Sequence, residues 1–230
     1  MDKKTIEPFP MRINKYLASQ KISTRRGADK LIEEGKVFIN GKLAQLGSQV
    51  NKKDVVEVRG EKKKEYLYFA YNKPIGVETV SPKKELFPLG RLDKNSHGLL
   101  ILTNDGRITD QLLNPKYFHE KEYVVKTKEK LRSSFKAKME AGVNIEGYVT
   151  KKCKVTILNN FTFRIVLTEG KKHQIRRMCS ALFQEVVDLR RIRITNIHLG
   201  NLKPNARRGI VGKELSTFLA PMLNPTPLTD

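Results

Sequence analysis

A series of short, apolar, strand-like runs constrains the fold of this chain more than any other feature of its sequence. Between residues 67 and 219 the runs are YLYFAYN, LLILT, KEYVVKT, KCKVTIL, FTFRIVLT and LRRIRITNIHL, with two or three helical stretches among them. Runs rich in β-branched and aromatic residues are typical of strands, and this mixture with helices is typical of an α+β fold. The sequence therefore predicts a mixed sheet flanked by helices over residues 67–220.

Residues 11–58 form a second predicted unit. The segment RINKYLAS has apolar residues at helical spacing, and Ser23 or Thr24 can cap a further helix that Gly35 can end. The Asn-Gly pair at 40–41 lies between two short strand-like runs, and both residue types tolerate the positive φ of a tight hairpin turn. The run VVEV adds another strand. We expect a helix pair followed by a small sheet.

Two polar segments mark the expected boundaries of these units. Residues 59–66, RGEKKKEY, are charged and lack apolar periodicity, so they are suited to a linker. Residues 221–230, PMLNPTPLTD, are proline-rich and also lack periodicity, so we expect a frayed tail.

The charge of the chain indicates what it binds. Lysine and arginine outnumber aspartate and glutamate by 45 to 24, which gives a formal net charge of +21 and a sequence pI near 10.0. Such an imbalance creates a long-range positive field, so the expected partner is a polyanion. Apolar stretches such as Leu99–Leu102 are far too short to span a membrane, and a membrane role is not expected.

Residue types that commonly bind metals do not cluster. Cys153 and Cys179 lie far apart without CxxC spacing, which supports neither a disulfide framework nor a zinc ribbon. We expect both thiols to pack in the core of a protein that resides in the reducing cytoplasm. The histidines are scattered, so no metal site is expected, and His173 is better suited to hydrogen bonding or RNA contact.

Basic residues lie at or near the starts of the two N-terminal helices. Positive side chains there oppose the helix dipole, so local stability does not explain them, whereas a phosphate-binding face does. The alternative is an ordinary solvated surface. The residues are Arg12, Lys15, Arg25 and Arg26.

The pattern MRINKYLASQKIS-RR-AD-LIEEGKVFINGK, over about 50 residues, resembles the S4 RNA-binding domain. This resemblance implies that residues 11–58 bind structured RNA. The domain is shared by several kinds of RNA-associated protein, so by itself it does not indicate a reaction.

Asp93 is the candidate catalytic residue. The segment FPLGRLDKNSHGLLILTNDG places it in a short polar loop before an apolar strand, which is a rigid support for a carboxylate. An isolated aspartate in a loop more often closes a turn through its side chain. The surrounding motif decides between these interpretations.

The stretch GRLDKNSHGLLILTN is similar to the signature of the RsuA/RluF type of ribosomal pseudouridine synthase. Other stretches agree in the expected order, namely YNKPIGV, HEKEYVV, TKKCKV and EGKKHQIRRM, so the resemblance covers nearly the whole chain. It implies a catalytic domain with a mixed, mainly antiparallel sheet that isomerises uridine in ribosomal RNA. HEKEY and TKKCKV look most like the F branch, which modifies the large-subunit (23S) RNA. The reaction changes no redox state, so no cofactor is expected.

The resemblance also assigns roles around Asp93, as a nucleophile or as a base, without choosing between them. A carboxylate in an enclosed pocket needs a nearby cation, and the family pairs it with the arginine of HQIR, here Arg176. Tyr123 of KEYVV is expected to line the site and hold the uracil, although a tyrosine in an apolar strand is more often a core residue. Arg176 is alternatively a surface arginine.

Several other residues are expected to contact RNA. Arg91 can enter the space that a flipped base leaves. Strand alternation in LRRIRITNIHL sends Ile192 and Ile194 to one face and Arg191 and Arg193 to the other, toward the RNA backbone. The remaining expected contacts are Lys94, Gln174, Arg177 and Lys203.

Two alternatives remain open on the sequence. A basic protein with an S4 module can act by binding alone, in ribosome assembly. The same chemistry can also act on small-subunit (16S) RNA or a tRNA. The sequence does not identify the target uridine, and we expect a monomer.

Overall fold

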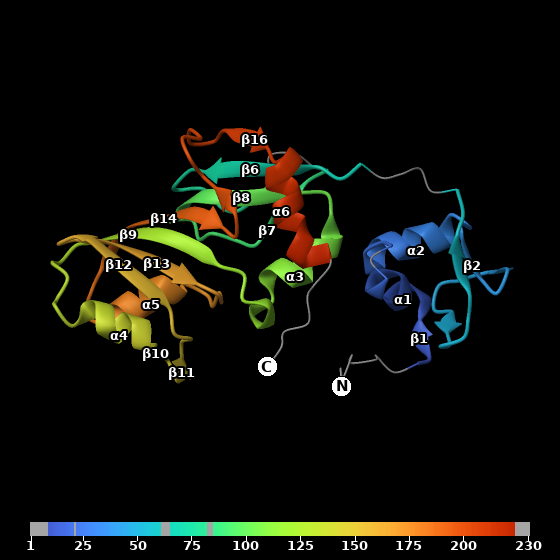
Figure 1. The fold of residues 1–230 in the computed structure, drawn as a ribbon, viewed down its shortest axis with the longest axis horizontal. Helices are drawn as coiled ribbons and strands as arrows, with labels where there is room; N and C mark the ends of the chain where they lie inside the picture. Colours follow the sequence, from blue (N-terminus) through green and yellow to red (C-terminus); the bar gives the residue numbers. More distant parts are fainter. Residues whose placement is uncertain (1–8, 21, 61–64, 82–84, 224–230) are drawn as a thin grey trace. The chain divides into compact units, whose positions relative to one another are not determined.

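The structure is a computed structural model that describes residues 9–20, 22–60, 65–81 and 85–223. It divides into two compact units, Met1–Tyr66 and Leu67–Asp230 (Figure 1). In the expected linker, residues 61–64 lie outside the described residues.

The first unit begins with the expected helix pair. Thr24 caps the second helix, because its side chain accepts a hydrogen bond from the Gly27 N–H. Asn40 and Gly41 have φ of 50° and 76°, so the expected hairpin turn is confirmed. The elements are β1 (Met11–Arg12), α1 (Ile13–Ser19), α2 (Arg25–Glu33), β2 (Val37–Ile39), β3 (Lys42–Leu43), β4 (Gln49–Val50) and β5 (Val56–Val58).

Apolar residues of both helices and of the small sheet form the core of the first unit. The fully buried side chains include Ile13 and Leu17 of α1, Ala28 of α2 and Val37 of β2. Arg12, Arg25 and Arg26 are exposed, and Lys15 is half-buried. The helix starts therefore carry exposed cations with no acidic residue in either first turn.

The second unit is the predicted α+β domain. Its strands are β6 (Tyr68–Lys73), β7 (Phe87–Leu89), β8 (His97–Thr103), β9 (Lys121–Thr127), β10 (Asn144–Ile145), β11 (Tyr148–Val149), β12 (Lys154–Asn159), β13 (Thr162–Leu167), β14 (Val186–Ile194), β15 (Ile197–His198) and β16 (Arg207–Gly209). Its helices are η1 (Gly106–Ile108), α3 (Thr109–Leu113), η2 (Pro115–Tyr117), α4 (Phe135–Ala141), α5 (Gln174–Ala181) and α6 (Gly212–Leu223).

A nine-stranded sheet in the order β12-β13-β9-β14-β8-β6-β16 is the frame of this unit, with β15 beside β14 and β7 beside β8. The described ladders of this sheet are antiparallel except that between β14 and β8. The expected mixed, mainly antiparallel sheet is confirmed. Figure 1 shows α4 and α5 together at the β12 end and α3 and α6 at the other end.

Gly98 allows β8 and β14 to approach each other at this parallel junction. Its φ is 103°, and a Cβ added to it would lie 2.3 Å from the main-chain oxygen of Arg191. An atom pair cannot be that close, so only glycine fits here. The junction brings the segment after β7 beside β14.

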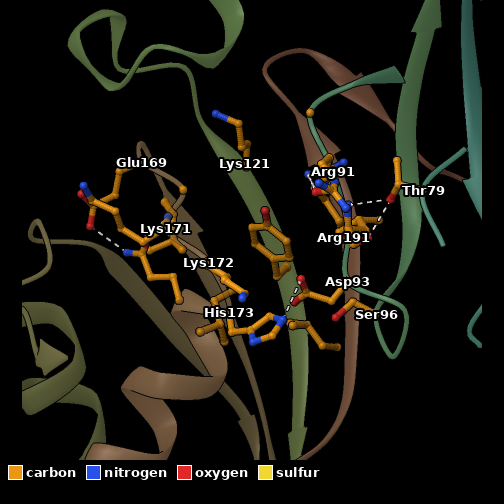
Figure 2. Close-up of a pocket in the computed structure, with 18 of the residues that line it drawn as sticks. Thr79, Arg91, Asp93, Ser96, Lys121, Glu169, Lys171, Lys172, His173 and Arg191 are labelled. Atoms are coloured by element: carbon orange, nitrogen blue, oxygen red, sulfur yellow. Dashed lines mark hydrogen bonds and ion pairs between the residues drawn. The ribbon is translucent and has the colours of Figure 1, made fainter. Parts of the chain in front are cut away.

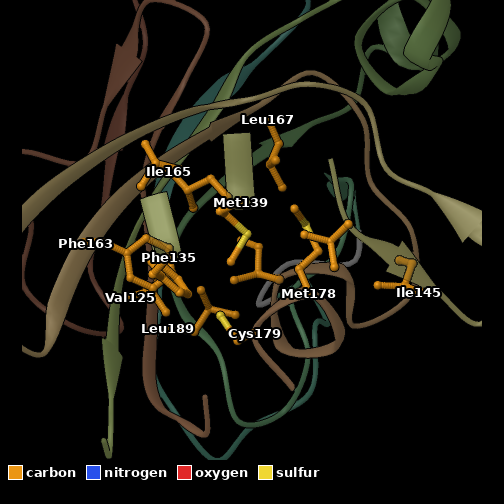
Figure 3. Packing of buried hydrophobic residues seen from close by; sticks show 13 residues of the cluster. Val125, Phe135, Met139, Ile145, Phe163, Ile165, Leu167, Met178, Cys179 and Leu189 are labelled. Carbon is orange, nitrogen blue, oxygen red and sulfur yellow. The ribbon is translucent and has the colours of Figure 1, made fainter. Parts of the chain in front are cut away.

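The largest described core cluster lies between the sheet and helices α4 and α5 (Figure 3). Phe135 and Phe163 meet edge to face at 4.9 Å between ring centroids. Cys179 is fully buried in this cluster and Cys153 packs against it, so both are free core thiols as expected. Burial raises the pKa of the Cys179 thiol to about 12.

The tail was predicted to begin at residue 221, but the last helix extends beyond this residue. Helix α6 continues through Pro221 to Leu223, and the side chain of Met222 is fully buried. Core packing of Met222 outweighs the loss of a main-chain donor at the proline. Residues 224–230 lie outside the described residues, and among those described no helix is long and apolar enough to cross a membrane.

Candidate active site

A cleft of about 710 Å³ opens in the second unit beside Asp93 (Figure 2). Four segments supply most of its lining: the loop of residues 90–96, here called the Asp93 loop, strands β9 and β14, and residues 169–175 at the start of α5. Residues 78 and 79, Leu113 and Leu167 complete it. Clefts of this size hold a small ligand such as a nucleotide. The Asp93 loop ends where β8 pairs with β14 at Gly98, so this parallel junction anchors the C-terminal end of the loop.

Hydrogen bonds to its main chain hold the Asp93 loop. Every carbonyl oxygen from Arg91 to Ser96 accepts at least one, so the backbone around the carboxylate is fixed. The donors are Arg191 Nη1 to Arg91 (3.5 Å), Thr79 Oγ1 to Leu92 (2.7 Å), Ser96 N to Asp93 (3.0 Å), Gly76 N and Lys73 Nζ to Lys94 (2.9 and 3.5 Å), Arg176 Nη2 to Asn95 (2.7 Å) and Lys73 Nζ to Ser96 (2.7 Å).

Lys73, at the end of β6, is fully buried below this loop. Its Nζ also donates to the Pro74 carbonyl at 3.0 Å, so all of its donors face carbonyl oxygens. Burial lowers the pKa of Lys73, and the negative charges of Asp93 and Glu78 oppose that shift. Sequence reasoning missed this residue, although the YNKP motif that contains it was recognised.

The predicted ion pair between Arg176 and Asp93 is not formed. Arg176 donates to the carbonyls of Asn95 and of Val186, at 2.7 and 3.0 Å. From the first turn of α5, Arg176 binds the backbone of the loop rather than its carboxylate. It therefore acts as a positioning residue in this structure.

His173 is the side chain in contact with the Asp93 carboxylate in the structure. Its Nε2 lies 3.2 Å from Asp93 Oδ1, and the two side chains are 49% and 36% exposed. His173 adopts a left-handed conformation directly before α5, with φ of 52°, and this turns the ring toward the loop. The sequence indicated hydrogen bonding for His173 but did not indicate its partner.

Tyr123 lines the cleft from β9, as predicted. Arg191 of β14 is its register partner, and the guanidinium lies 6.0 Å from the centre of the tyrosine ring. Tyr123 also packs against apolar residues on both sides of the sheet junction. Its ring is thereby held at the wall of the cleft, beside a buried cation.

The predicted row of cations on β14 is wrong. A bulge shifts the register between Arg191 and Arg193, so Arg191 pairs with Tyr123 and Arg193 pairs with Glu122. The extra residue places the two arginines on opposite faces. Arg191 is buried in the cleft, whereas Arg193 forms ion pairs with Glu122 and Glu120 at 2.6 and 2.8 Å.

Gln174 and Arg177 make contacts within the protein. Gln174 is buried at the cleft, its amide nitrogen donates to Glu169 Oε1 at 2.7 Å, and its amide oxygen accepts from the Lys171 N–H at 2.8 Å. Arg177 forms an ion pair with Glu146. Both side chains are used to hold the start of α5.

The other predicted RNA contacts divide between the cleft and the rest of the surface. Arg91 and Lys94 are exposed and line the cleft. Lys203 is exposed outside it, in the turn before β16. The structure places Lys121, Lys171 and Lys172 in the cleft as well, which sequence reasoning missed. Strand alternation could have found Lys121, because it lies two residues from Tyr123.

The comparisons with known proteins agree with this geometry. Residues 48–181 match the family model described as RNA pseudouridylate synthase, and residues 11–56 match the S4 domain. The chain belongs to the RNA pseudouridylate synthase family. A relative named RluF confirms the resemblance to the RsuA/RluF type of this family.

Members of the family are similar to this chain over most of its length. The dual-specificity RNA pseudouridine synthase RluF of Escherichia coli (strain K12) is 41% identical over 223 residues, which cover 89% of this chain and 77% of the relative. Ribosomal large subunit pseudouridine synthase B of Bacillus subtilis (strain 168) is 32% identical over 233 residues, or 91% and 96%. A solved crystal structure of a pseudouridylate synthase is 29% identical with a TM-score of 0.67, and the match covers 90% of this chain and 98% of that one.

Proposed function

We propose that this pseudouridine synthase isomerises a uridine of large-subunit ribosomal RNA at the Asp93 carboxylate. The observation that carries the proposal is the Asp93 loop, whose carbonyls from Arg91 to Ser96 are all hydrogen-bonded, so that one carboxylate is held at the edge of a nucleotide-sized cleft. A catalytic group must be held within fractions of an ångström of its productive position.

The reaction assigns a task to each side of the cleft. The bond from N1 of uracil to C1′ breaks, the ring turns, C5 bonds to C1′, and C5 loses a proton while N1 gains one, so atoms balance without a redox partner. Asp93 acts at the sugar, either as a nucleophile at C1′ or as a base. Tyr123 supports the uracil face, and its hydroxyl is available to receive the C5 proton.

The S4 module and the exposed cations of the cleft supply the RNA contacts in this proposal. Arg91 lies two residues before Asp93 at the mouth of the cleft, so it is suited to filling the space of the flipped base. The large subunit is favoured because a relative with 96% coverage is a ribosomal large subunit synthase. Another relative is named as having dual RNA specificity, so the assay also includes other classes of RNA, among them small-subunit RNA and tRNA. The proposal places the enzyme, as a monomer, in the bacterial cytoplasm, because the ribosomal RNA on which its relatives act is found there.

The test maps pseudouridine in RNA from a deletion strain after incubation with wild-type protein or with Asp93→Asn. Large-subunit and small-subunit RNA are assayed separately, each as free RNA and as an assembly intermediate, and tRNA is assayed as free RNA. We expect one or a few large-subunit sites with wild type and at least a 10³-fold lower rate with Asp93→Asn, because the variant retains shape and loses the charge. Sites in small-subunit RNA or tRNA alone would contradict the large-subunit assignment.

The competing interpretation is a protein that acts by binding alone. It predicts that neither wild type nor Asp93→Asn modifies any of the RNA substrates. The absence of modification by wild type on all five preparations would favour it.

A further inference from the structure

Lys121 places a positive charge inside the cleft that the proposed reaction does not use. It begins β9 two residues before Tyr123, so both side chains lie on the same face of the strand. It is half-buried, and its Nζ donates to the His119 carbonyl at 3.2 Å. Among the described residues no carboxylate lies within ion-pair distance of it. Figure 2 shows its amine in the cleft, opposite Glu169 and Lys171.

Arg191 adds a second buried cation to the same cleft. It is 3% exposed, its Nε donates to the Leu99 carbonyl at 2.7 Å, and its Nη1 reaches the Arg91 carbonyl. Its Nη2 is buried and has no hydrogen-bond partner within the described part of the chain. A guanidinium donor left unpaired in a cleft of this kind is available to a ligand.

These two cations repel each other, and no acidic side chain of the cleft is in direct contact with either of them. Burial and the charge of Arg191 lower the pKa of Lys121 to about 8. No described carboxylate of the cleft forms an ion pair with either cation: Asp93 lies beside His173, Glu169 accepts hydrogen bonds from Tyr148, Gln174 and the Lys151 N–H, and Glu78 is exposed. Two cations at one wall that lack an acidic partner form a site with a deficit of negative charge.

We propose that Lys121 and Arg191 form a phosphate subsite, which binds a phosphodiester of the flipped nucleotide while its uracil lies against Tyr123. The inference rests on the proposed function and adds the part of the substrate that these two residues recognise. A phosphate carries the missing charge, and it offers several acceptor oxygens to an ammonium and a guanidinium at once. A uracil carbonyl is neutral and would leave both cations uncompensated.

The subsite also explains how one nucleotide is oriented over Asp93. A phosphate held at β9 and β14 and a ring held at Tyr123 fix the nucleotide at two points, and the sugar between them then faces the Asp93 loop. Orientation of this kind supplies a large part of the rate enhancement in reactions of bound substrates.

The test uses uridine 5′-monophosphate, uridine and inorganic phosphate as probes of the full-length wild-type protein. The pKa of Lys121 is followed by NMR through the Cε resonances of labelled lysine, with Lys121→Arg used for assignment. We expect the monophosphate, and inorganic phosphate at higher concentration, to raise the pKa of Lys121 by about one unit or more. Uridine should leave it unchanged. Lys136, exposed on α4, is the reference lysine in the same spectra.

Binding affinity provides the second readout. Lys121→Met should weaken binding of the monophosphate about tenfold and leave binding of uridine unchanged, since a charge-assisted hydrogen bond is removed. Lys121→Arg should retain most of the affinity, and Lys136→Met should retain all of it. An unmoved Lys121 titration with the monophosphate overturns the subsite, as does an equal rise with uridine.

The outcomes separate this inference from the proposed function. If the monophosphate raises the pKa of Lys121 while no RNA is modified, the phosphate subsite stands and the proposed reaction fails. If RNA is modified in an Asp93-dependent way while Lys121 does not respond, the reaction stands and the subsite is wrong.

Discussion

Lys73, Arg176 and Arg191 surround the Asp93 loop with positive charge, yet the hydrogen bonds of all three go to main-chain carbonyls. A carbonyl accepts from a cation without neutralising it. The loop is therefore held in place by three groups that keep their positive charge, and this charge adds to the attraction of an RNA phosphate. At the residue scale, positioning and electrostatics are provided by the same side chains.

Lys121→Met should stabilise the protein at pH 7. The pKa of Lys121 is lowered to about 8 in the folded state, from about 10.4 in an unfolded chain, so folding pays a penalty wherever both states are protonated. The wild type regains this stability as the pH rises from about 8 to about 10.4, because the unfolded state then binds more protons. The variant should melt about 2–4 °C higher at pH 7 for each kcal/mol removed, and the gap should close near pH 10.

Thermal unfolding of wild type, Lys121→Met and Lys136→Met across this pH range checks the prediction. Lys136 is exposed, so its substitution introduces the same side chain without relieving a buried charge. A melting temperature for Lys121→Met that is equal to or below that of wild type at pH 7 would show that Lys121 carries no such penalty.

At the scale of elements, the junction of β8 and β14 should be the least tolerant part of the sheet. Gly98→Ala would place a Cβ 2.3 Å from the Arg191 oxygen, at a φ of 103°. The strands must separate, so we expect a loss of about 3 kcal/mol or more in unfolding free energy and a loss of activity, because the Asp93 loop directly precedes β8. Denaturant unfolding provides the measurement.

Gly147→Ala is the matched control for this substitution. Gly147 also has a positive φ, of 84°, but an added Cβ meets nothing within 4 Å. The control carries the backbone strain alone, of about 1 kcal/mol. Equal losses for both variants would mean that strain rather than the strand approach makes Gly98 necessary.

The sequence predicted those elements whose signals are local. The Thr24 cap and the Asn40-Gly41 turn each depend on a few neighbouring residues, and both are confirmed. The position of Arg176 depends on a helix packed against a loop that is distant in the sequence, and the position of Arg193 depends on a bulge. Neither feature produces a recognisable pattern in the sequence. Asp93 was found because its motif is specific, whereas its partner His173 depends on a left-handed turn.

At the scale of the whole molecule, the net charge of +21 raises the concentration of RNA near every surface of the protein. Such a field does not say where the RNA lies. Some exposed cations contact phosphates directly, and others only add to the field. Two variants that lose the same number of charges at different places distinguish these two groups.

Replacing Arg25 and Arg26 by Gln should reduce the salt dependence of RNA binding. Both are exposed in the first turn of α2, where a cation opposes the helix dipole, so the change should not destabilise the helix. Removing one bound phosphate from the interface lowers the slope of log affinity against log salt by about 0.7–0.9, so a reduction of about 1.4–1.8 is expected for the pair.

Lys136 and Lys138, exposed on α4, supply the matched pair, since their replacement by Gln lowers the net charge by the same amount. The affinity for the unmodified target RNA is measured from 50 to 200 mM salt. All proteins in this comparison carry Asp93→Asn, so that the RNA is not converted during the measurement. If the field alone mattered, both double variants would reduce the slope equally. A reduction confined to Arg25 and Arg26 requires direct phosphate contacts at the start of α2, because the two proteins then differ only in where the charge was removed.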